Sequence, residues 1–385
     1  MEHEFTKTIK SILAEEFGKN ANAIYRNSLL IQYLNEKTRS ASRDSKSRPS
    51  FANLYAVYVL VEDYIEQGYM ESGDYSKYQG AQYTRLFRRM RQLPFGEKLQ
   101  NHALNNRMNS EFEKFFPTSG VIPILRDLNT KSYWINESLL RVSVGKRVVN
   151  IANVIIRIID AYVEARKNSF QKFISQCNQL KEISKSDTET IKHFILGLLS
   201  PTSDARLFEI VSFAILKYYY IDTIIYWGFE RKLKSLNAEN AHLYKTGRTN
   251  ANDGGIDFVM KPLGRFFQVT ETLDFRKYFL DIDKLERYPI TFVIKTDDEV
   301  CNIRQRLKED AQKTYTIEKI VEKYMDCIEE IINIPILTQR CIDVFNKNRT
   351  SEVLDEIILQ SMVEFNYMDP DGQDIDDMDN EESVL

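Results

Sequence analysis

The chain has 385 residues, a formal net charge of −4 and 43% hydrophobic residues, which is enough apolar surface to build substantial cores. No run approaches the roughly 20 apolar residues of a membrane span, and the first residues lack the apolar core of a signal peptide. The four cysteines lie far apart without a C-x-x-C pair, so neither a zinc site nor a disulfide framework is indicated. We therefore expect a globular cytoplasmic protein that does not bind membranes.

The charge is distributed unevenly along the chain. Residues 369–385 carry eight acids and no base, so residues 1–368 carry a net charge of +4. A mildly basic body is compatible with a nucleic-acid partner, because phosphates attract Lys and Arg. The acidic segment at 369–385 is expected to be a disordered tail.

The N-terminal half is predicted to be helical. Apolar residues recur at helical spacing from Phe5 to Leu34 and again from Phe51 to Tyr69. Between them, residues 37–50 hold five bases among serines, which indicates either a solvated surface loop or a loop that touches phosphates. We assign residues 1–200 to a helical DNA-recognition domain.

A basic stretch follows at residues 77–107, with seven bases and one acid. Asn and Gln side chains are interleaved with these bases. Since Arg reads guanine edges and Asn or Gln reads adenine in the major groove, this composition favours DNA recognition over a featureless basic surface. The residues expected to bind DNA are Arg85, Arg88, Arg89 and Arg91.

The second half is predicted to form an α+β domain over residues 201–298. Pro201 and a potential N-cap at Ser203 mark the boundary. Residues 299–368 return to helical periodicity, which predicts helices that pack on this core or on a second subunit. The expected core elements are a helix at 204–220, strands at 221–227, around Asp257 and around Gln268, a helix at 274–286 and a strand at 290–294.

The stretch from Lys245 to Glu271 is the most informative part of the sequence. Gly254 and Gly255 permit a sharp turn before a short strand that contains Asp257. A second turn at 262–264 leads into a return strand. Because side chains alternate along a strand, Gln268 and Thr270 share one face of it, and that face should meet Asp257.

This hairpin resembles the active site of the PD-(D/E)XK nuclease superfamily. The resemblance rests on two motifs, Gly-Gly-Ile-Asp at 254–257 and Gln-Val-Thr at 268–270. The second motif is similar to the Gln-x-Lys that ends the variant form of the family hairpin. The resemblance implies that Asp257 and Gln268 bind a divalent metal, and that Thr270 stands where the family has a lysine that assists the attacking water. The predicted order of helix, three strands, helix and strand also matches the family core, and its first helix carries Glu209 where many members have a glutamate.

Several residues are candidates to complete such a site. Oxygen ligands suit Mg²⁺, and a neutral Gln would be helped by a further carboxylate, either Glu209 or Glu271. Glu209 could instead pair with Arg206, and Asp257 could merely close a glycine turn. The positive charge of the missing lysine could come from another nearby base, namely Lys261, Arg265 or Lys295.

Together these features predict a Mg²⁺-dependent type II restriction endonuclease that acts on double-stranded DNA as a homodimer, paired with a separate DNA methyltransferase. The loop at 245–252, with Arg248, Asn250 and Asn252, is a second expected DNA contact. One alternative is a modification-dependent endonuclease with a pocket for a flipped base. Another is a catalytically inactive DNA-binding protein with a nuclease-like fold, as Thr270 suggests. Neither G-x-x-x-x-G-K-[ST] nor G-x-G-x-x-G occurs, so no nucleotide-binding loop is expected.

Overall fold

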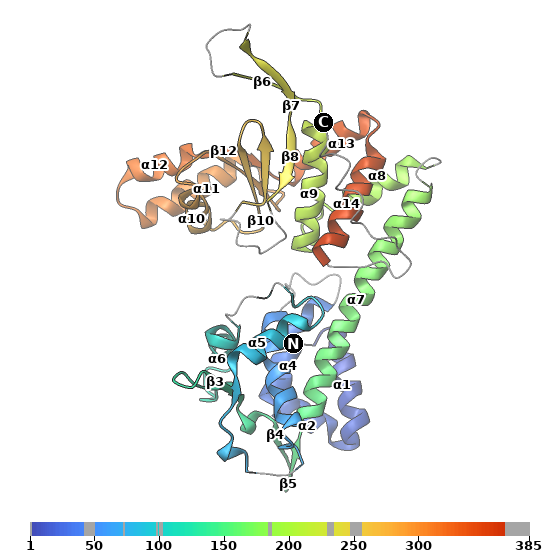
Figure 1. Cartoon of the computed structure of the whole chain (residues 1–385), viewed down its shortest axis with the longest axis vertical. Helices are drawn as coiled ribbons and strands as arrows, with labels where there is room; N and C mark the ends of the chain where they lie inside the picture. The colour runs from blue at the N-terminus through green and yellow to red at the C-terminus, as the bar shows by residue number, and fades with distance from the viewer. Residues whose placement is uncertain are drawn as a thin grey trace. The chain divides into compact units, whose positions relative to one another are not determined.

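The chain forms two compact units, Met1–Ser175 and Gln176–Leu385, in a computed structural model (Figure 1). Among the described residues, no helix combines the length and the apolarity that a membrane span requires. The division precedes the boundary expected near residue 201, because α8 (Thr188–Gly197) packs on helices of the second unit. The structure describes residues 2–41, 51–71, 74–97, 99, 103–183, 187–228, 235–246 and 256–365.

The first unit is built around a helical core. Its central helix, α4, is almost entirely buried, because apolar and aromatic residues occupy most of its positions. Ser28 caps α3 by accepting a hydrogen bond from the backbone N–H of Ile31. The helices are α1 (Glu4–Phe17), α2 (Ala21–Asn27), α3 (Leu29–Lys37), α4 (Phe51–Glu66), α5 (Tyr83–Gln92), α6 (Met108–Phe115) and the first part of α7 (Ala152–Ile183).

This unit also contains strands that the sequence reading missed. Three of them form a small sheet, and two more form a hairpin that turns at Gly145, which has positive φ. These strands are four residues long or shorter, so each shows too few alternations to be recognised from periodicity. Their bounds are β1 (Ala81–Gln82), β2 (Ile124–Asp127), β3 (Ser132–Ile135), β4 (Arg141–Val144) and β5 (Arg147–Asn150).

The second unit is a mixed α+β unit with a five-stranded sheet in the order β12-β11-β10-β9-β8. The three strands β8, β9 and β10 are antiparallel neighbours, and β10, β11 and β12 run parallel. Helix α10 (Phe275–Lys284) connects the parallel strands β10 and β11, as a crossover requires. The strands are β8 (His242–Lys245), β9 (Phe258–Lys261), β10 (Arg265–Thr270), β11 (Ile290–Ile294) and β12 (Ile328–Ile332).

Helices cover both faces of this sheet (Figure 1). On one face, which we call the α9 face, Phe258 and Phe267 pack with Phe213 and Tyr220 of α9 (Ala205–Tyr220). On the other, the α10 face, Phe292 packs against Tyr278 of α10. The cover of the α10 face is completed by α11 (Val300–Thr314) and α12 (Glu318–Asp326), while α13 (Ile334–Asn346) and α14 (Thr350–Phe365) pack on α9.

Two elements of the second unit differ from the prediction. The strand predicted at 221–227 exists as β6 (Ile224–Trp227), but it pairs with β7 (Asn237–Asn240) in a separate ribbon, and β8 takes the edge position in the sheet. Residues 328–332, predicted as helical, form β12 instead. The sequence Ile-Glu-Glu-Ile-Ile fits either period over so short a run, and pairing with the buried strand β11 decides in favour of a strand.

Candidate active site

Asp257 is held at the start of β9 by backbone hydrogen bonds on both sides. Its N–H donates to the carbonyl oxygen of Phe267 at 2.9 Å, and its own carbonyl oxygen accepts from the N–H of Thr246 at 3.0 Å. Its carboxylate oxygen Oδ2 accepts from the backbone N–H of Val269 at 2.6 Å. The carboxylate therefore lies directly against β10, beside the residues predicted to act with it.

Gln268 lies on the α10 face. It is paired with Phe292 of β11, whose ring packs on α10. The pairing of β9 with β10 ends at Phe258 with Phe267, so Asp257 directly precedes β9 instead of lying within the strand as predicted. Its carboxylate accepts from the backbone N–H of Val269, the residue after Gln268, which brings the two predicted ligands to the same end of the hairpin.

The side-chain oxygen of Gln268 accepts no hydrogen bond from the part of the chain that the structure describes. Gln268 is 8% exposed, its Nε2 donates to the carbonyl oxygen of Val269 at 3.3 Å, and its Oε1 is buried without a hydrogen-bond donor among the described residues. An unsatisfied buried acceptor costs about 1–3 kcal/mol, so such atoms are rare in folded proteins. The orphaned oxygen is available to a ligand that enters beside Asp257.

A lysine that the sequence reading missed reaches Thr270, at the end of β10. The ammonium group of Lys277 donates to Thr270 Oγ1 at 3.1 Å. Lys277 lies in the first turn of α10, which Asp274 caps by accepting from the N–H of Arg276. A signal was present in the sequence, because a helix that starts a few residues after a strand returns over the end of that strand. Lys277 thus brings a positive charge to the side chain of Thr270 at the end of β10.

The other predicted carboxylates face α9 and are ion-paired. Glu209 lies 3.0 Å from the ammonium group of Lys245, and both side chains are about one-tenth exposed. Lys245 is paired in register with Phe258, whose ring faces α9. Glu271 pairs with Lys295 at 2.6 Å. Neither Glu209 nor Glu271 is therefore brought to Gln268, and Glu209 pairs with Lys245 rather than with Arg206.

The bases considered as substitutes for the missing lysine differ in position. Lys261 ends β9 four residues beyond Asp257, and its ammonium group lies over the ring of Tyr244 at 5.1 Å. Arg265 begins β10 and donates to Glu330 at 2.6 Å and to Thr291. Lys295 lies beside the end of β10, because its N–H donates to the carbonyl oxygen of Thr270 at 2.9 Å, but its ammonium group is paired with Glu271.

The four arginines predicted to bind DNA differ in their partners. Arg85 pairs with the buried carboxylate of Asp63, and Arg89 makes two parallel hydrogen bonds to Glu62, at 2.8 and 2.7 Å. Arg91 donates to the carbonyl oxygen of Glu97. Arg88 is exposed and makes no hydrogen bond or ion pair within the described part of the chain. Of these four arginines, Arg88 and Arg91 are the two for which the described part of the chain shows no ion pair with a carboxylate.

One part of the predicted site falls on residues that the structure does not describe. Arg248, Asn250 and Asn252 of the expected DNA-contacting loop, the glycines at 254 and 255, and the acidic tail at 369–385 lie outside the described residues. Within the described residues, no group of three or more His, Cys, Asp and Glu side chains is arranged to hold a metal ion.

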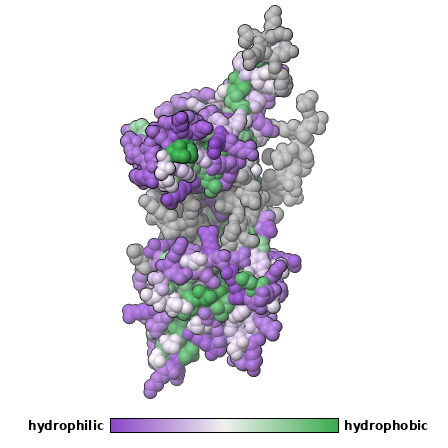
Figure 2. All heavy atoms as spheres, turned by 90° about the vertical axis from the view of Figure 1, so that its left-hand side faces the viewer, coloured by the Kyte–Doolittle hydropathy of each residue, from purple (hydrophilic) through white to green (hydrophobic). Residues whose placement is uncertain are grey.

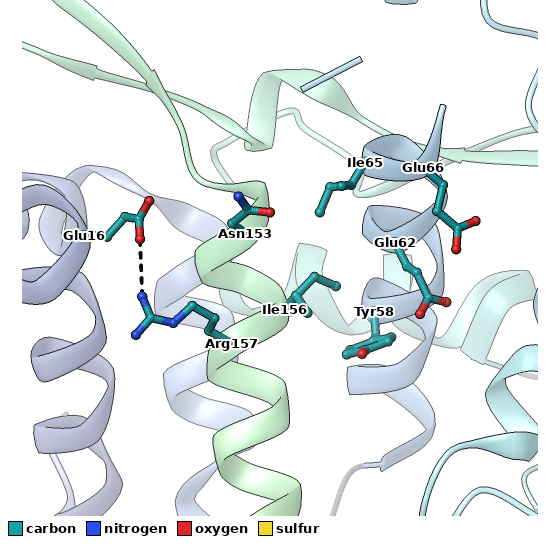
Figure 3. A pocket seen from close by; sticks show the side chains of 8 residues that line it. All are labelled: Glu16, Tyr58, Glu62, Ile65, Glu66, Asn153, Ile156 and Arg157. Carbon is teal, nitrogen blue, oxygen red and sulfur yellow. Dashed lines mark hydrogen bonds and ion pairs between the residues drawn. The ribbon is translucent and has the colours of Figure 1, made fainter. Parts of the chain in front are cut away.

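A groove in the first unit has a different character. It has a volume of about 380 Å³ and lies between α1, α4 and α7, with Glu62 and Glu66 on α4 and Ile156 on α7 (Figure 3). Arg157, at its edge, is paired with Glu15 and Glu16. Burial raises the pKa of the Tyr58 hydroxyl in its wall to about 12, so this group stays protonated. An acidic groove repels phosphates, and nothing in it favours a bound nucleic acid.

The fold and site thus define a mixed α+β unit with a polar cluster at the end of β10. Comparison of the chain with protein-family models, with curated proteins and with solved structures finds no match.

Proposed function

We propose that this chain is a metal-dependent endonuclease that hydrolyses phosphodiester bonds in double-stranded DNA, with its active site at the carboxyl end of β10. The observation that carries the proposal is the buried oxygen of Gln268, which has no donor among the described residues, next to Val269, whose N–H holds the carboxylate of Asp257. The topology supports it, since ligands of α/β sheets bind outside the carboxyl ends of parallel strands, and β10 runs parallel to β11 there.

The residues present fit a hard divalent cation. Asp257 and the Oε1 atom of Gln268 offer oxygen ligands, and Mg²⁺ in proteins is commonly held by one or two carboxylates together with waters and substrate phosphates. A bound Mg²⁺ would polarise the phosphate and lower the pKa of the attacking water. The backbone bonds to Asp257 hold its carboxylate against β10, so the ligand geometry is preorganised.

Lys277 supplies the positive charge in this proposal. Its hydrogen bond to Thr270 fixes the ammonium group at the end of β10, two residues from Gln268. A fixed cation aimed at a phosphodiester stabilises the charge that develops in the transition state. We therefore assign to Lys277 the role that the resemblance gave to the residue at position 270.

Among DNA endonucleases, we favour a type II restriction enzyme. A palindromic site is twofold symmetric, which favours a homodimer, and the host DNA would be protected by a separate methyltransferase. A modification-dependent enzyme would instead cut methylated DNA. Digestion of methylated and unmethylated plasmids separates the two.

The central experiment is plasmid digestion with and without Mg²⁺, by the wild type, by Asp257→Asn and by the control variant Glu209→Gln. Cleavage that requires Mg²⁺ and is lost in Asp257→Asn, but kept in Glu209→Gln, supports the proposal. No cleavage of any plasmid by a folded wild-type protein, or equal cleavage by Asp257→Asn, would overturn it.

A second candidate is a DNA-binding protein that does not cut. The observation that favours it is the hydrogen bond from Val269 to the carboxylate of Asp257, which a purely structural Asp at a strand end would also make. A wild type that shifts a DNA duplex in a gel but leaves every plasmid intact would establish this reading.

A further inference from the structure

Asp281 on α10 is a buried carboxylate. The helices α10, α11 and α12 cover the α10 face of the sheet, and the outer surface of this layer is largely hydrophilic (purple, upper part of Figure 2). Charged residues of such helices normally lie on that outer surface, because burying an ion is costly unless it is paired. Asp281 is instead only 3% exposed. Both of its carboxylate oxygens therefore require partners.

One of these two oxygens has a partner among the described residues. Oδ1 accepts a hydrogen bond at 2.9 Å from the ammonium group of Lys284, which lies on the same helix. Oδ2 is buried and accepts no hydrogen bond from the part of the chain that the structure describes. Leaving a buried acceptor unsatisfied costs about 1–3 kcal/mol, and more when the group is charged. Oδ2 of Asp281 thus resembles Oε1 of Gln268, which is also buried without a described donor.

Helix and strand geometry place Asp281 at the level of Gln268. Because β10 and β11 are parallel, α10, which connects them, runs back along β10 in the opposite direction. Lys277 in the first turn of α10 reaches Thr270 at 3.1 Å. Asp281 lies four residues, or about 6 Å, further along the helix on the same face. Gln268 lies two residues, or about 7 Å, back along the strand in the same direction.

The side chain of Asp281 lies on the β10 side of α10. Tyr278 packs on Phe292 of β11, the middle of the three parallel strands. Phe279 stacks on Tyr324 of α12, which packs next to β12. Because a helix turns by about 100° per residue, Asp281 lies on the opposite side of Tyr278 from Phe279. The strand order β12-β11-β10 makes that the side of β10.

Three oxygen-bearing side chains therefore converge beside Val269. The N–H of Val269 donates to the carboxylate of Asp257, and its carbonyl oxygen accepts from Nε2 of Gln268. Asp281 covers Gln268 from α10. Two carboxylates and a neutral amide carry two negative charges, which balance the charge of a divalent cation. Oxygen ligands of this kind suit hard cations.

We propose that Asp281 is a further ligand of the divalent cation, which it reaches from α10 through Oδ2, while Asp257 and Gln268 reach the ion from the hairpin. This inference rests on the proposed function for the place of the cation. Lys284 bonds Oδ1 and so orients the carboxylate with Oδ2 toward β10. The hydrogen bond to Thr270 holds Lys277 beside the same site, where its charge can meet a phosphate.

The test is Mn²⁺ binding to the full chain, measured by the loss of the free-ion signal in electron paramagnetic resonance. Mn²⁺ takes the same oxygen ligands as Mg²⁺. Asp281→Asn keeps the shape of the side chain and should weaken Mn²⁺ binding by about tenfold or more, because affinity depends on the number of charged ligands. Asp283→Asn is the matched control on the same helix. The side chain of Asp283 is 49% exposed and bonds the hydroxyl of Tyr324, so this variant should bind Mn²⁺ as the wild type does.

Cleavage of the chain by bound Fe²⁺ gives a second readout that does not depend on a variant. Fe²⁺ in the site, with ascorbate and peroxide, should cut the backbone both near Gln268 and near Asp281, and excess Mg²⁺ should suppress both cuts. Cuts near Gln268 alone would overturn the inference. Equal Mn²⁺ affinity in the wild type and Asp281→Asn would also overturn it and would leave a water as the partner of Oδ2.

The outcomes separate this inference from the proposed function. If Asp281→Asn loses Mn²⁺ binding but the wild type cuts no DNA, the cation site stands and the proposed endonuclease fails. If Asp281→Asn binds Mn²⁺ and cuts DNA as the wild type does, while Asp257→Asn does neither, the endonuclease stands and Asp281 is not a ligand. A wild type that leaves millimolar Mn²⁺ unbound overturns the inference.

Discussion

The polar and charged side chains on the two faces of the five-stranded sheet differ in their partners. On the α9 face, Glu209 is paired with Lys245 and Glu271 with Lys295. On the α10 face, at the end of β10, the buried oxygen of Gln268 finds no donor among the described residues, and Lys277 bonds a neutral hydroxyl. Both faces are covered by helices of the same unit, so burial alone does not explain the difference.

This contrast separates structural charges from those available for chemistry. A buried ion pair satisfies both partners and holds its elements together, whereas removing one partner leaves an uncompensated charge. A buried acceptor without a donor weakens the fold, and a water, an ion or a ligand can satisfy it. The ion pairs of the α9 face therefore support the sheet, and the α10 face is where we propose that catalysis occurs. Variants on each face test this difference.

The largest expected effect is on the α10 face. Asp257→Asn should lower Mg²⁺-dependent cleavage by about three orders of magnitude, because loss of a charged ligand removes several kcal/mol of transition-state stabilisation. The amide oxygen can still accept from Val269, so the folded state should persist. Initial rates on supercoiled plasmid measure the effect. An activity within tenfold of the wild type would show that Asp257 is a structural residue.

The next largest effect is a loss of stability, expected on the α9 face. Lys245→Met removes the ammonium group that pairs with the buried carboxylate of Glu209, which should lower the free energy of unfolding by about 3 kcal/mol. Hydrogen exchange of the α9 amides reports the loss within this unit. Lys261→Met is the control, since this lysine only lies over the ring of Tyr244 and its loss should cost about 1 kcal/mol or less. Equal losses in the two variants would contradict the contrast between structural and available charges.

Only part of this difference between the α9 face and the α10 face could be predicted from the sequence. Alternation along the strand predicted that Gln268 and Thr270 share one face of β10, as their pairing with Phe292 and Ile294 of β11 shows, because a period of two is fixed by the backbone. It could not show that α9 covers the opposite face, which separates Glu209 from that pair. Nor could it show that residues 221–227 leave the sheet and that β8 replaces them, since strand order is decided by long-range pairing. Lys277 was not predicted, because the motif places the lysine at position 270. The contact of Lys277 with Thr270 depends on the residue at which α10 starts.

Lys277→Met should lower cleavage by about a hundredfold, the effect of removing one fixed group that stabilises transition-state charge. Lys284→Met is the matched control on the same helix, because Lys284 is ion-paired with Asp281 and does not reach β10. Lys277→Arg keeps the charge with a different shape and should recover part of the rate. If Lys277→Met cuts as fast as Lys284→Met, the charge for the reaction comes from another residue.

Gln268→Leu should separate stability from activity. Leucine fills a similar volume without a buried acceptor, so the free energy of unfolding should rise by about 1–2 kcal/mol while cleavage falls. Hydrogen exchange of the β10 amides measures the first effect, and plasmid digestion measures the second. A variant that is both less stable and fully active would show that the orphaned oxygen serves no ligand.

The smallest effect extends the same rule to the arginines of α5. Arg88 pairs with no carboxylate of the described residues, whereas Arg89 is held by Glu62. If unpaired charge marks the contact with phosphates, Arg88→Ala should weaken duplex binding by a few-fold and reduce the salt dependence by about one released counterion. Arg89→Ala should instead loosen the packing of α5 on α4, because it leaves Glu62 without its bidentate partner. Binding titrations at several salt concentrations distinguish the two variants, and an unchanged salt slope in Arg88→Ala would remove α5 from the DNA interface.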